Sequence, residues 1–418
     1  MELRIKGIIC KQVMKTCMKL PVLIVALFLV IGTASALSLP GVPAGTQAST
    51  PDLVYVASFE GGHRFQAGDY PVIVLTGSYR EMGRQYGALM KPELNEEYAY
   101  LIGTLAKREY SQDRARAEGR NITTFYPRRM KEVFIGMSET SGLTEEDIAI
   151  LYYGAIFQLM TKPPVPVSCS YLATWGDYTT DGSVIASRNW DLDDEVMPFT
   201  KWYVLTVYRP TDGSNAVATW SPAGMRPETF MNSRGLFIAN DNSGILDDAP
   251  EPRPEFVTEF YRFMFDYSDL LALDAGIRGT ATDTAWIVDV AGPEGSFVYE
   301  KMTNRTLQRT GDGVVAAANH LVDPSWNFPA PPEHSLSRYN NILRLAGEAK
   351  GSIDAARMMQ IRDVCLENGG AKFCHSLLFG SKYSSNHQVV FVPKTRTVWV
   401  NAMDRPWQKI ELAPLFNN

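Results

Sequence analysis

The sequence contains few histidines and cysteines, and this scarcity limits the chemistry that the chain can perform. Five histidines are scattered through 418 residues, and neither an HExxH motif nor a zinc-finger spacing of cysteines occurs. GxGxxG and P-loop motifs are also absent, so we expect no metal and no cofactor. The formal net charge of −6 argues against a nucleic-acid partner. What is present is an ordinary globular composition, with 45% hydrophobic residues to build a core.

The first 36 residues (1–36) have the pattern of an export signal. Lys11, Lys15 and Lys19 precede an apolar run over 20–31, and Ala34-Ser35-Ala36 forms a small-residue cleavage site. The run is shorter than the roughly 20 residues that a membrane span requires. We therefore expect a secreted or cell-envelope protein that meets the membrane only through this segment; an uncleaved anchor is the alternative.

Removal of the signal would leave three cysteines, Cys169, Cys365 and Cys374. An odd number of cysteines in an exported protein indicates a free thiol or an intermolecular pairing. A disulfide between Cys365 and Cys374 would leave Cys169 unpaired. The alternative is that all three cysteines stay reduced and buried.

The mature chain changes character at a proline-rich linker, KPPVPV, at 162–167. Before it, 37–168 has the pattern of a mostly helical segment, with capped helices beginning near Ser78 and Thr144. After it, alternating apolar residues and Asp-Gly turns predict antiparallel strands, and helical spacing over 255–273 predicts a core helix. The residues alone therefore predict an α+β fold with mostly antiparallel sheets.

The stretch 167–191 predicts a β-hairpin whose two ends carry reactive side chains. One end is Cys169; after an Asp-Gly turn the chain returns to Arg188 and Asp191. A thiol, a guanidinium and a carboxylate are therefore expected at one edge of a sheet. A cysteine becomes a nucleophile when its thiolate is stabilised and a base is close. Cleavage between Ser168 and Cys169 would supply that base as a free α-amino group; a buried cysteine beside a surface ion pair is the alternative.

Cys169 followed by RNWD at 188–191 resembles the N-terminal nucleophile cysteine hydrolases. The similar groups are the self-cleaving family typified by isopenicillin N acyltransferase and the choloylglycine (bile salt and penicillin V) hydrolases. The resemblance implies a four-layer αββα sandwich. It also implies that a small chain, 37–168, and a catalytic large chain, 169–418, stay associated after cleavage at Ser168.

The same resemblance implies roles for three further residues. Asn242 takes the position of an oxyanion-hole asparagine, although an Asx turn would also explain it. Asn319 follows a predicted strand beside the active site. Arg338 occupies the family's Ser-Arg-aromatic segment, with Ser337 expected to cap a helix there; a solvated arginine is the alternative.

The sequence thus predicts an exported, self-cleaving cysteine hydrolase that cleaves a linear amide of a small N-acyl substrate through a thioester on Cys169. Three alternatives remain: acyl transfer to an amine, a papain-like peptidase that pairs Cys169 with His320, and a non-catalytic envelope protein of the same fold. Aromatic residues near the predicted site indicate an apolar acyl pocket. These residues are Trp175, Trp190, Trp202 and Tyr339.

Overall fold

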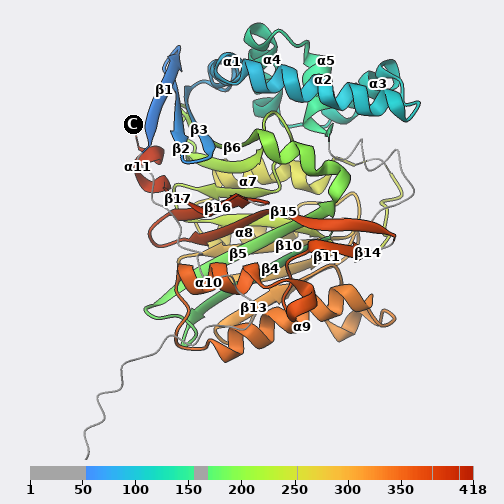
Figure 1. The fold of residues 1–418 in the computed structure, drawn as a ribbon, viewed down its shortest axis with the longest axis vertical. Helices are drawn as coiled ribbons and strands as arrows, with labels where there is room; N and C mark the ends of the chain where they lie inside the picture. The colour runs from blue at the N-terminus through green and yellow to red at the C-terminus, as the bar shows by residue number, and fades with distance from the viewer. Residues whose placement is uncertain (1–52, 155–167, 252, 379, 404, 418) are drawn as a thin grey trace, which may run out of the picture. The chain divides into compact units, whose positions relative to one another are not determined.

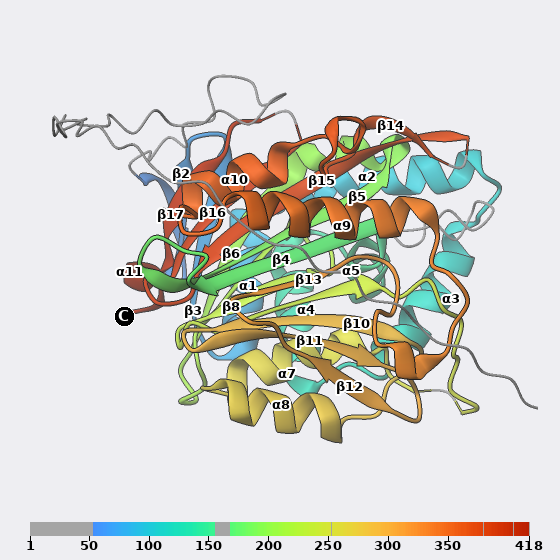
Figure 2. The same ribbon diagram turned by 90° about the horizontal axis from the view of Figure 1, so that it is seen from below.

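Two mainly antiparallel β-sheets lie face to face between two layers of helices (Figures 1 and 2). The computed structural model describes residues 53–154, 168–251, 253–378, 380–403 and 405–417. The expected signal segment and the proline-rich linker lie outside these residues.

The predicted hairpin forms the centre of a seven-stranded sheet. Its strands place Cys169 directly opposite Trp190 and Ser168 opposite Asp191. The turn needs glycine at position 182, because φ there is 76°, a region that other residues rarely adopt. The sheet order is β13 (Val314–Ala317), β4 (Ser168–Gly176), β5 (Gly182–Asp193), β15 (Ser381–Val392), β16 (Thr397–Ala402) and β17 (Gln408–Glu411), and β14 (Cys374–Leu378) also pairs with β15.

The second sheet has ten strands, and three of them come from the segment that was predicted to be mostly helical. Strand β3 (Tyr70–Gly77) pairs in parallel with β6 (Tyr203–Pro210), which lies on the other side of the expected cleavage point, so this sheet joins the two parts of the chain. The order is β1 (Val54–Phe59), β2 (Gly62–Ala67), β3 (Tyr70–Gly77), β6 (Tyr203–Pro210), β7 (Val217–Pro222), β8 (Thr229–Asn232), β9 (Phe237–Asn242), β10 (Trp286–Gly292), β11 (Gly295–Lys301) and β12 (Thr306–Arg309).

Alternation along β4 sends successive side chains to two different cores. Cys169 and Tyr171 belong to the core between the sheets, whereas Leu172 packs with residues of the helices outside the seven-stranded sheet. Those helices are α9 (Glu333–Glu348) and α10 (Ala355–Asp363); α7 (Glu259–Asp266) and α8 (Leu270–Gly279) cover the other sheet (Figure 2). The four-layer αββα order implied by the resemblance is therefore confirmed.

A group of helices follows β3 and includes both predicted capping boxes, at Ser78 and Thr144. Helices α1 (Tyr79–Leu89) and α4 (Arg128–Ser141) pack closely because Gly83 has no side chain: a Cβ there would lie 2.2 Å from the carbonyl oxygen of Val133. Among the described residues no helix has the length and apolarity needed to cross a membrane. The group comprises α1 (Tyr79–Leu89), α2 (Lys91–Lys107), α3 (Gln112–Thr123), α4 (Arg128–Ser141) and α5 (Glu145–Tyr152).

Two predictions about helices are wrong. The single helix over 255–273 is broken at Tyr267, which is extended, and Asp269 caps a new helix by accepting the N–H of Ala272. Ser337 lies inside α9, because that helix already begins after Pro332, a residue suited to a helix start. The remaining short elements are η1 (Asp194–Trp202), η2 (Phe256–Thr258), η3 (Pro324–Trp326), η4 (Leu366–Asn368) and α11 (Leu412–Phe416).

Candidate active site

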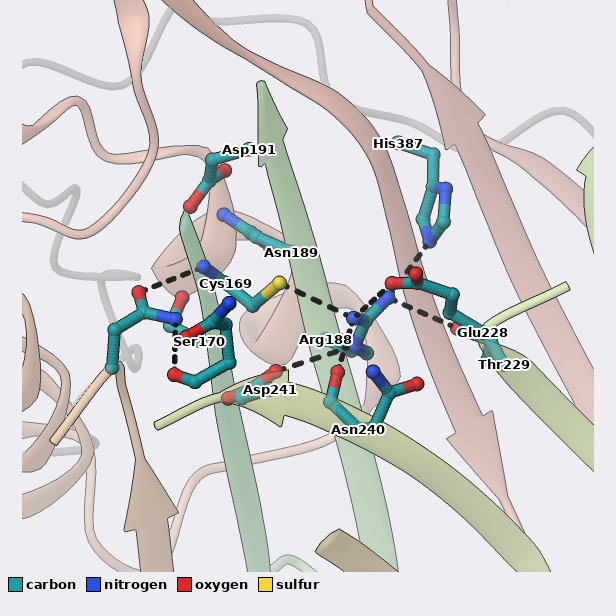
Figure 3. Close-up of polar contacts among 12 residues, drawn as sticks. Cys169, Ser170, Arg188, Asn189, Asp191, Glu228, Thr229, Asn240, Asp241 and His387 are labelled. Carbon is teal, nitrogen blue, oxygen red and sulfur yellow. Dashed lines mark hydrogen bonds and ion pairs between the residues drawn. The ribbon is translucent and has the colours of Figure 1, made fainter. Parts of the chain in front are cut away.

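The thiol of Cys169 points into the core between the two sheets, beside a buried guanidinium. Cys169 is a free cysteine and is 1% exposed. Nη2 of Arg188 donates to its Sγ at 3.3 Å (Figure 3). Burial raises the pKa of the Cys169 thiol well above its usual value, and the positive charge of Arg188 acts in the opposite direction. The thiol is therefore protonated at neutral pH, and its proton must pass to an acceptor when the sulfur reacts.

Arg188 is held by groups from several strands and points one nitrogen at the sulfur (Figure 3). Its Nη2 also donates to Glu228 Oε2 at 3.2 Å and to the carbonyl oxygen of Asn240. Nη1 donates to Thr229 Oγ1 at 3.4 Å, and Nε lies 3.4 Å from Asp241 Oδ1. This set of acceptors fixes the direction of the guanidinium, so its charge is aimed at the thiol rather than at solvent.

His387 is a further acceptor for Arg188. Its Nε2 lies 3.4 Å from Arg188 Nη1, and because arginine can only donate, Nε2 must accept. The ring proton then sits on Nδ1, 2.7 Å from the hydroxyl oxygen of Tyr203, whose own hydrogen goes to Asn386 Oδ1 at 2.8 Å. Burial lowers the pKa of His387 well below its usual value. His387 is therefore neutral and holds Arg188 in place.

Three buried carboxyl groups face Arg188. Burial raises the pKa of Asp241 to about 6, against the opposing effect of Arg188. Burial, and then the neighbouring Asp241, raise the pKa of Asp289 well above its usual value. Glu228 also forms an ion pair with Arg226 at 2.8 Å. The charge of Arg188 is consequently balanced by Asp241 and Glu228, its two ion-pair partners.

The main chain of Cys169 is held by two residues that the resemblance implied. Its N–H donates to Asn319 Oδ1 at 2.9 Å, and its carbonyl oxygen accepts from Nη1 of Arg338. Arg338 Nη2 donates to the same Asn319 oxygen at 2.6 Å. Asn319 Nδ2 in turn donates to the carbonyl oxygen of Asn242 at 2.9 Å. The structure thus brings Asn319 and Arg338 together at the peptide unit of the candidate nucleophile.

Asp191 lies at the same sheet edge as Cys169 and Arg188 but points to the opposite face. Residues three apart on a strand face opposite sides, so Asp191 turns away from the face of Arg188 and toward α9. Its Oδ1 accepts from Ser385 Oγ, and its Oδ2 lies 3.4 Å from Arg338 Nη1. Burial raises the pKa of Asp191 to about 6, and Arg338 opposes this rise. Asp191 therefore contacts Arg338 and Ser385 rather than the thiol.

Asn242 is the exposed last residue of β9. Its Oδ1 accepts the N–H of Gly244 at 2.7 Å, which is the Asx turn that the sequence left open. Because the oxygen is engaged in this bond, any oxyanion role of Asn242 belongs to its amide nitrogen, and that role stays a prediction.

Replacing Asn242 with alanine tests this role. If its Nδ2–H binds the developing oxyanion, kcat is expected to fall by about 10²–10³, as for other single oxyanion donors, with KM little changed. The measurement is steady-state kinetics on the processed fraction. Ser243→Ala, at the neighbouring turn position, is the control. A loss smaller than about tenfold would assign Asn242 to the turn alone.

His320 and most of the aromatic residues named in the sequence predictions lie away from the Cys169 thiol. Nδ1 of His320 shares a hydrogen bond with Ser335 Oγ at 2.7 Å, and burial lowers its pKa to about 4. This bond gives a papain-like pairing with Cys169 no support. Of the four aromatic residues, Trp190 lies directly opposite Cys169 in the ladder. The others are Trp175, at the far end of β4; Trp202, packed with Tyr100 and Phe199; and Tyr339, against the His320 ring.

Sequence reasoning missed the groups that accept from Arg188 and missed Ser385, which donates to Asp191. The position of Asp241 could have been predicted from the sequence. Side chains alternate along a strand, so in Asn240-Asp241-Asn242 the aspartate lies on the opposite face of the strand from the two asparagines. His387 and Ser385 give no local signal, since their partners lie on β5. Among the described residues, His, Cys, Asp and Glu side chains form no group of three suited to a metal ion.

No protein-family model and no curated protein matches this sequence. Solved structures similar to it include a mutant and a variant of conjugated bile acid hydrolase from Clostridium perfringens. Each is 13% identical to this chain, with TM-scores of 0.45 and 0.44. Each match covers 60% of this chain; the first covers 94% of the hydrolase chain and the second 95%. Penicillin V acylase from Agrobacterium tumefaciens is 12% identical, with a TM-score of 0.43. The match covers 58% of this chain and 86% of the acylase chain. A Caenorhabditis elegans N-acylethanolamine-hydrolyzing acid amidase ortholog is 10% identical (TM-score 0.37; 54% and 93%).

Proposed function

We propose that this protein is an exported, self-processing cysteine hydrolase that cleaves a linear amide bond of a small N-acyl substrate. One observation carries the proposal: a single residue, Cys169, is held at three points. Arg188 contacts its thiol, Asn319 accepts its N–H, and Arg338 donates to its carbonyl oxygen. Any buried residue needs partners for its main-chain N–H and C=O, but a structural cysteine needs no guanidinium directed at its thiol.

Self-cleavage is supported by the burial of the bond to be cut. Ser168 is 0% and Cys169 is 1% exposed, so a separate protease has no access to the peptide bond between them. In the proposed step, Cys169 Sγ attacks the Ser168 carbonyl carbon and forms a thioester. The peptide C–N bond breaks and the thiol proton passes to the nitrogen. Water then hydrolyses the thioester, which leaves a Ser168 carboxylate and a free α-amino group on Cys169.

That amino group supplies the missing base for substrate turnover. With a reference pKa of about 7.7–8.0, it accepts the thiol proton near neutral pH. Sγ then attacks the substrate carbonyl, the proton leaves with the departing amine, and water hydrolyses the thioester on Cys169. Arg188 favours the thiolate, and Asn242 is the proposed oxyanion donor. Asn319, Arg338 and Asp191 keep the nucleophile's main chain in position.

Two structural features support the remaining parts of the proposal. Cys365 and Cys374 form the expected disulfide, and disulfides persist mainly in oxidising compartments, which favours export. The parallel pairing of β3 with β6 would keep the small and large chains associated after cleavage, because sheet hydrogen bonds join them.

A panel of N-acyl amides with increasing acyl length tests the function. Trp190 lies beside Cys169 and is expected to line an apolar acyl site, so each added CH2 should raise kcat/KM by roughly threefold to fourfold, from about 0.8 kcal/mol per buried CH2. Detection of the free acid identifies hydrolysis, and a new amide would identify acyl transfer.

Two variants complete this experiment. Trp190→Ala should flatten the dependence on acyl length, whereas Trp175→Ala, at the end of β4 far from Cys169, should preserve it. Turnover by Cys169→Ala at the wild-type rate would overturn the function, and a flat wild-type profile would overturn the apolar acyl site.

A further inference from the structure

The disulfide closes a short loop that ends beside the candidate active site. Cys365 follows α10 and Cys374 begins β14. Within the loop, the N–H of Leu366 donates to the carbonyl oxygen of Lys372 at 2.8 Å, and the N–H of Gly370 donates to that of Cys365 at 2.9 Å. The loop is therefore tied both covalently and by its own hydrogen bonds. The residue just before its second cysteine, Phe373, is held in a defined place.

The ring of Phe373 supports the guanidinium of Arg338. Phe373 is 1% exposed, and the guanidinium carbon of Arg338 lies 5.1 Å from the ring centroid. Arg338 is completely buried, where a cation over an aromatic ring gains more than it does in water. The same guanidinium donates to the carbonyl oxygen of Cys169 and to Asn319. The position of the ring thus determines where Arg338 can meet the nucleophile.

The main chain of Phe373 acts on Asp191 through Ser385. The N–H of Ser385 donates to the Phe373 carbonyl oxygen at 2.9 Å, and the N–H of Phe373 donates to Ser385 Oγ at 3.1 Å. The Ser385 hydroxyl has one hydrogen. Because its oxygen accepts the Phe373 N–H, that hydrogen is free to be donated to Asp191 Oδ1. One residue therefore contacts Arg338 with its ring and orients the donor to Asp191 with its backbone.

We infer that Phe373, held by the Cys365–Cys374 disulfide, positions the Arg338–Asp191 pair beside the Ser168–Cys169 bond. Phe373 and Ser385 are positioning residues, because they act through Arg338 and Asp191 and touch neither the thiol nor its peptide unit. The expected effect on turnover rests on the proposed function, whereas the expected effect on the order of β4 does not.

The kinetic test compares three full-length variants. Cys365→Ser/Cys374→Ser removes the disulfide, and Phe373→Leu keeps an apolar side chain without the aromatic face. Ile410→Ala, in the far edge strand β17, serves as a control for general destabilisation. We expect the first two to lower kcat and the rate of self-cleavage on the order of tenfold, the size of a buried cation–π contact, with KM little changed. Ile410→Ala should retain the wild-type kcat per folded molecule.

Hydrogen exchange on the Cys169→Ala background gives a readout that does not require activity. Removing the disulfide or the Phe373 ring should speed exchange in β4 and at the start of α9 relative to Ile410→Ala. The comparison is made under conditions in which the variants and the control have the same urea unfolding midpoint. Exchange and kcat equal to those of the control would overturn the inference. If the disulfide and Phe373 variants exchange faster but the wild-type protein hydrolyses no amide, the positioning is upheld and the proposed function is overturned.

Discussion

Replacing Cys169 with alanine is expected to leave the protein as one chain, whereas the wild-type protein should separate into 37–168 and 169–418. The reason is that the only nucleophile proposed for the Ser168–Cys169 bond is the thiol next to it. The bond is buried and its N–H is held by Asn319, so neither a separate protease nor an unfolded segment explains a cut there. Intact-mass measurement of purified protein under denaturing conditions reads the result directly.

Cys169→Ser is the graded control for this experiment. The hydroxyl occupies nearly the same place but is a weaker acid and a poorer nucleophile, so cleavage should be slowed strongly rather than abolished. The Cys365→Ser/Cys374→Ser variant should still cleave, although about tenfold more slowly, and so separates a requirement for this thiol from a requirement for cysteine in general. An active wild-type protein that retains a single chain across Ser168 would sink the mechanism.

The β-hairpin and its turn were predictable from the sequence because both are local. The Asp-Gly turn and the apolar runs on either side specify β4 and β5, and the register that results places Ser168 opposite Asp191. Strands β1 and β2 were not predicted, and neither was the pairing of β3, since its partner β6 lies far along the chain and no local pattern indicates that partner. The break at Tyr267 was missed because the apolar spacing on its two sides is similar.

The candidate site divides in the same way between local and distant information. Cys169, Arg188 and Asp191 were found together because one hairpin carries all three. Their division between two faces follows from alternation along the strand and could have been read from the spacing of Arg188 and Asp191. The groups that hold them, such as Ser385, come from distant strands. These groups could not be predicted because they are far apart in the sequence from the residues they contact, not because their side chains lack suitable chemistry.

Arg188→Met is expected to abolish turnover and to lower the free energy of unfolding by about 3–5 kcal/mol, the usual cost of removing one partner from a buried ion pair. Arg188 is fully buried between Cys169 and the carboxylates of Asp241 and Glu228. Without it, the thiolate loses its counter-charge and two carboxylates lose a partner. Urea unfolding at neutral pH and amide turnover measure the two losses.

The double variant Arg188→Met/Asp241→Asn distinguishes charge balance from catalysis. Removing the uncompensated carboxylate should restore part of the unfolding free energy but none of the turnover, because Cys169 still lacks its cation. Full recovery of activity in the double variant would contradict the role of Arg188 at the thiol.

The stability cost of Arg188→Met should also depend on pH. Burial already raises the pKa of Asp241 to about 6, and loss of the arginine removes the group that opposes this rise. A carboxyl whose folded pKa is raised binds its proton more tightly when folded, so its contribution to stability decreases as pH rises above the unfolded value of about 3.9. In the variant this decrease continues to higher pH than in the wild type. The difference in unfolding free energy between the two proteins should therefore be smaller at pH 5 than at pH 8, and a difference independent of pH would show that Asp241 does not depend on Arg188.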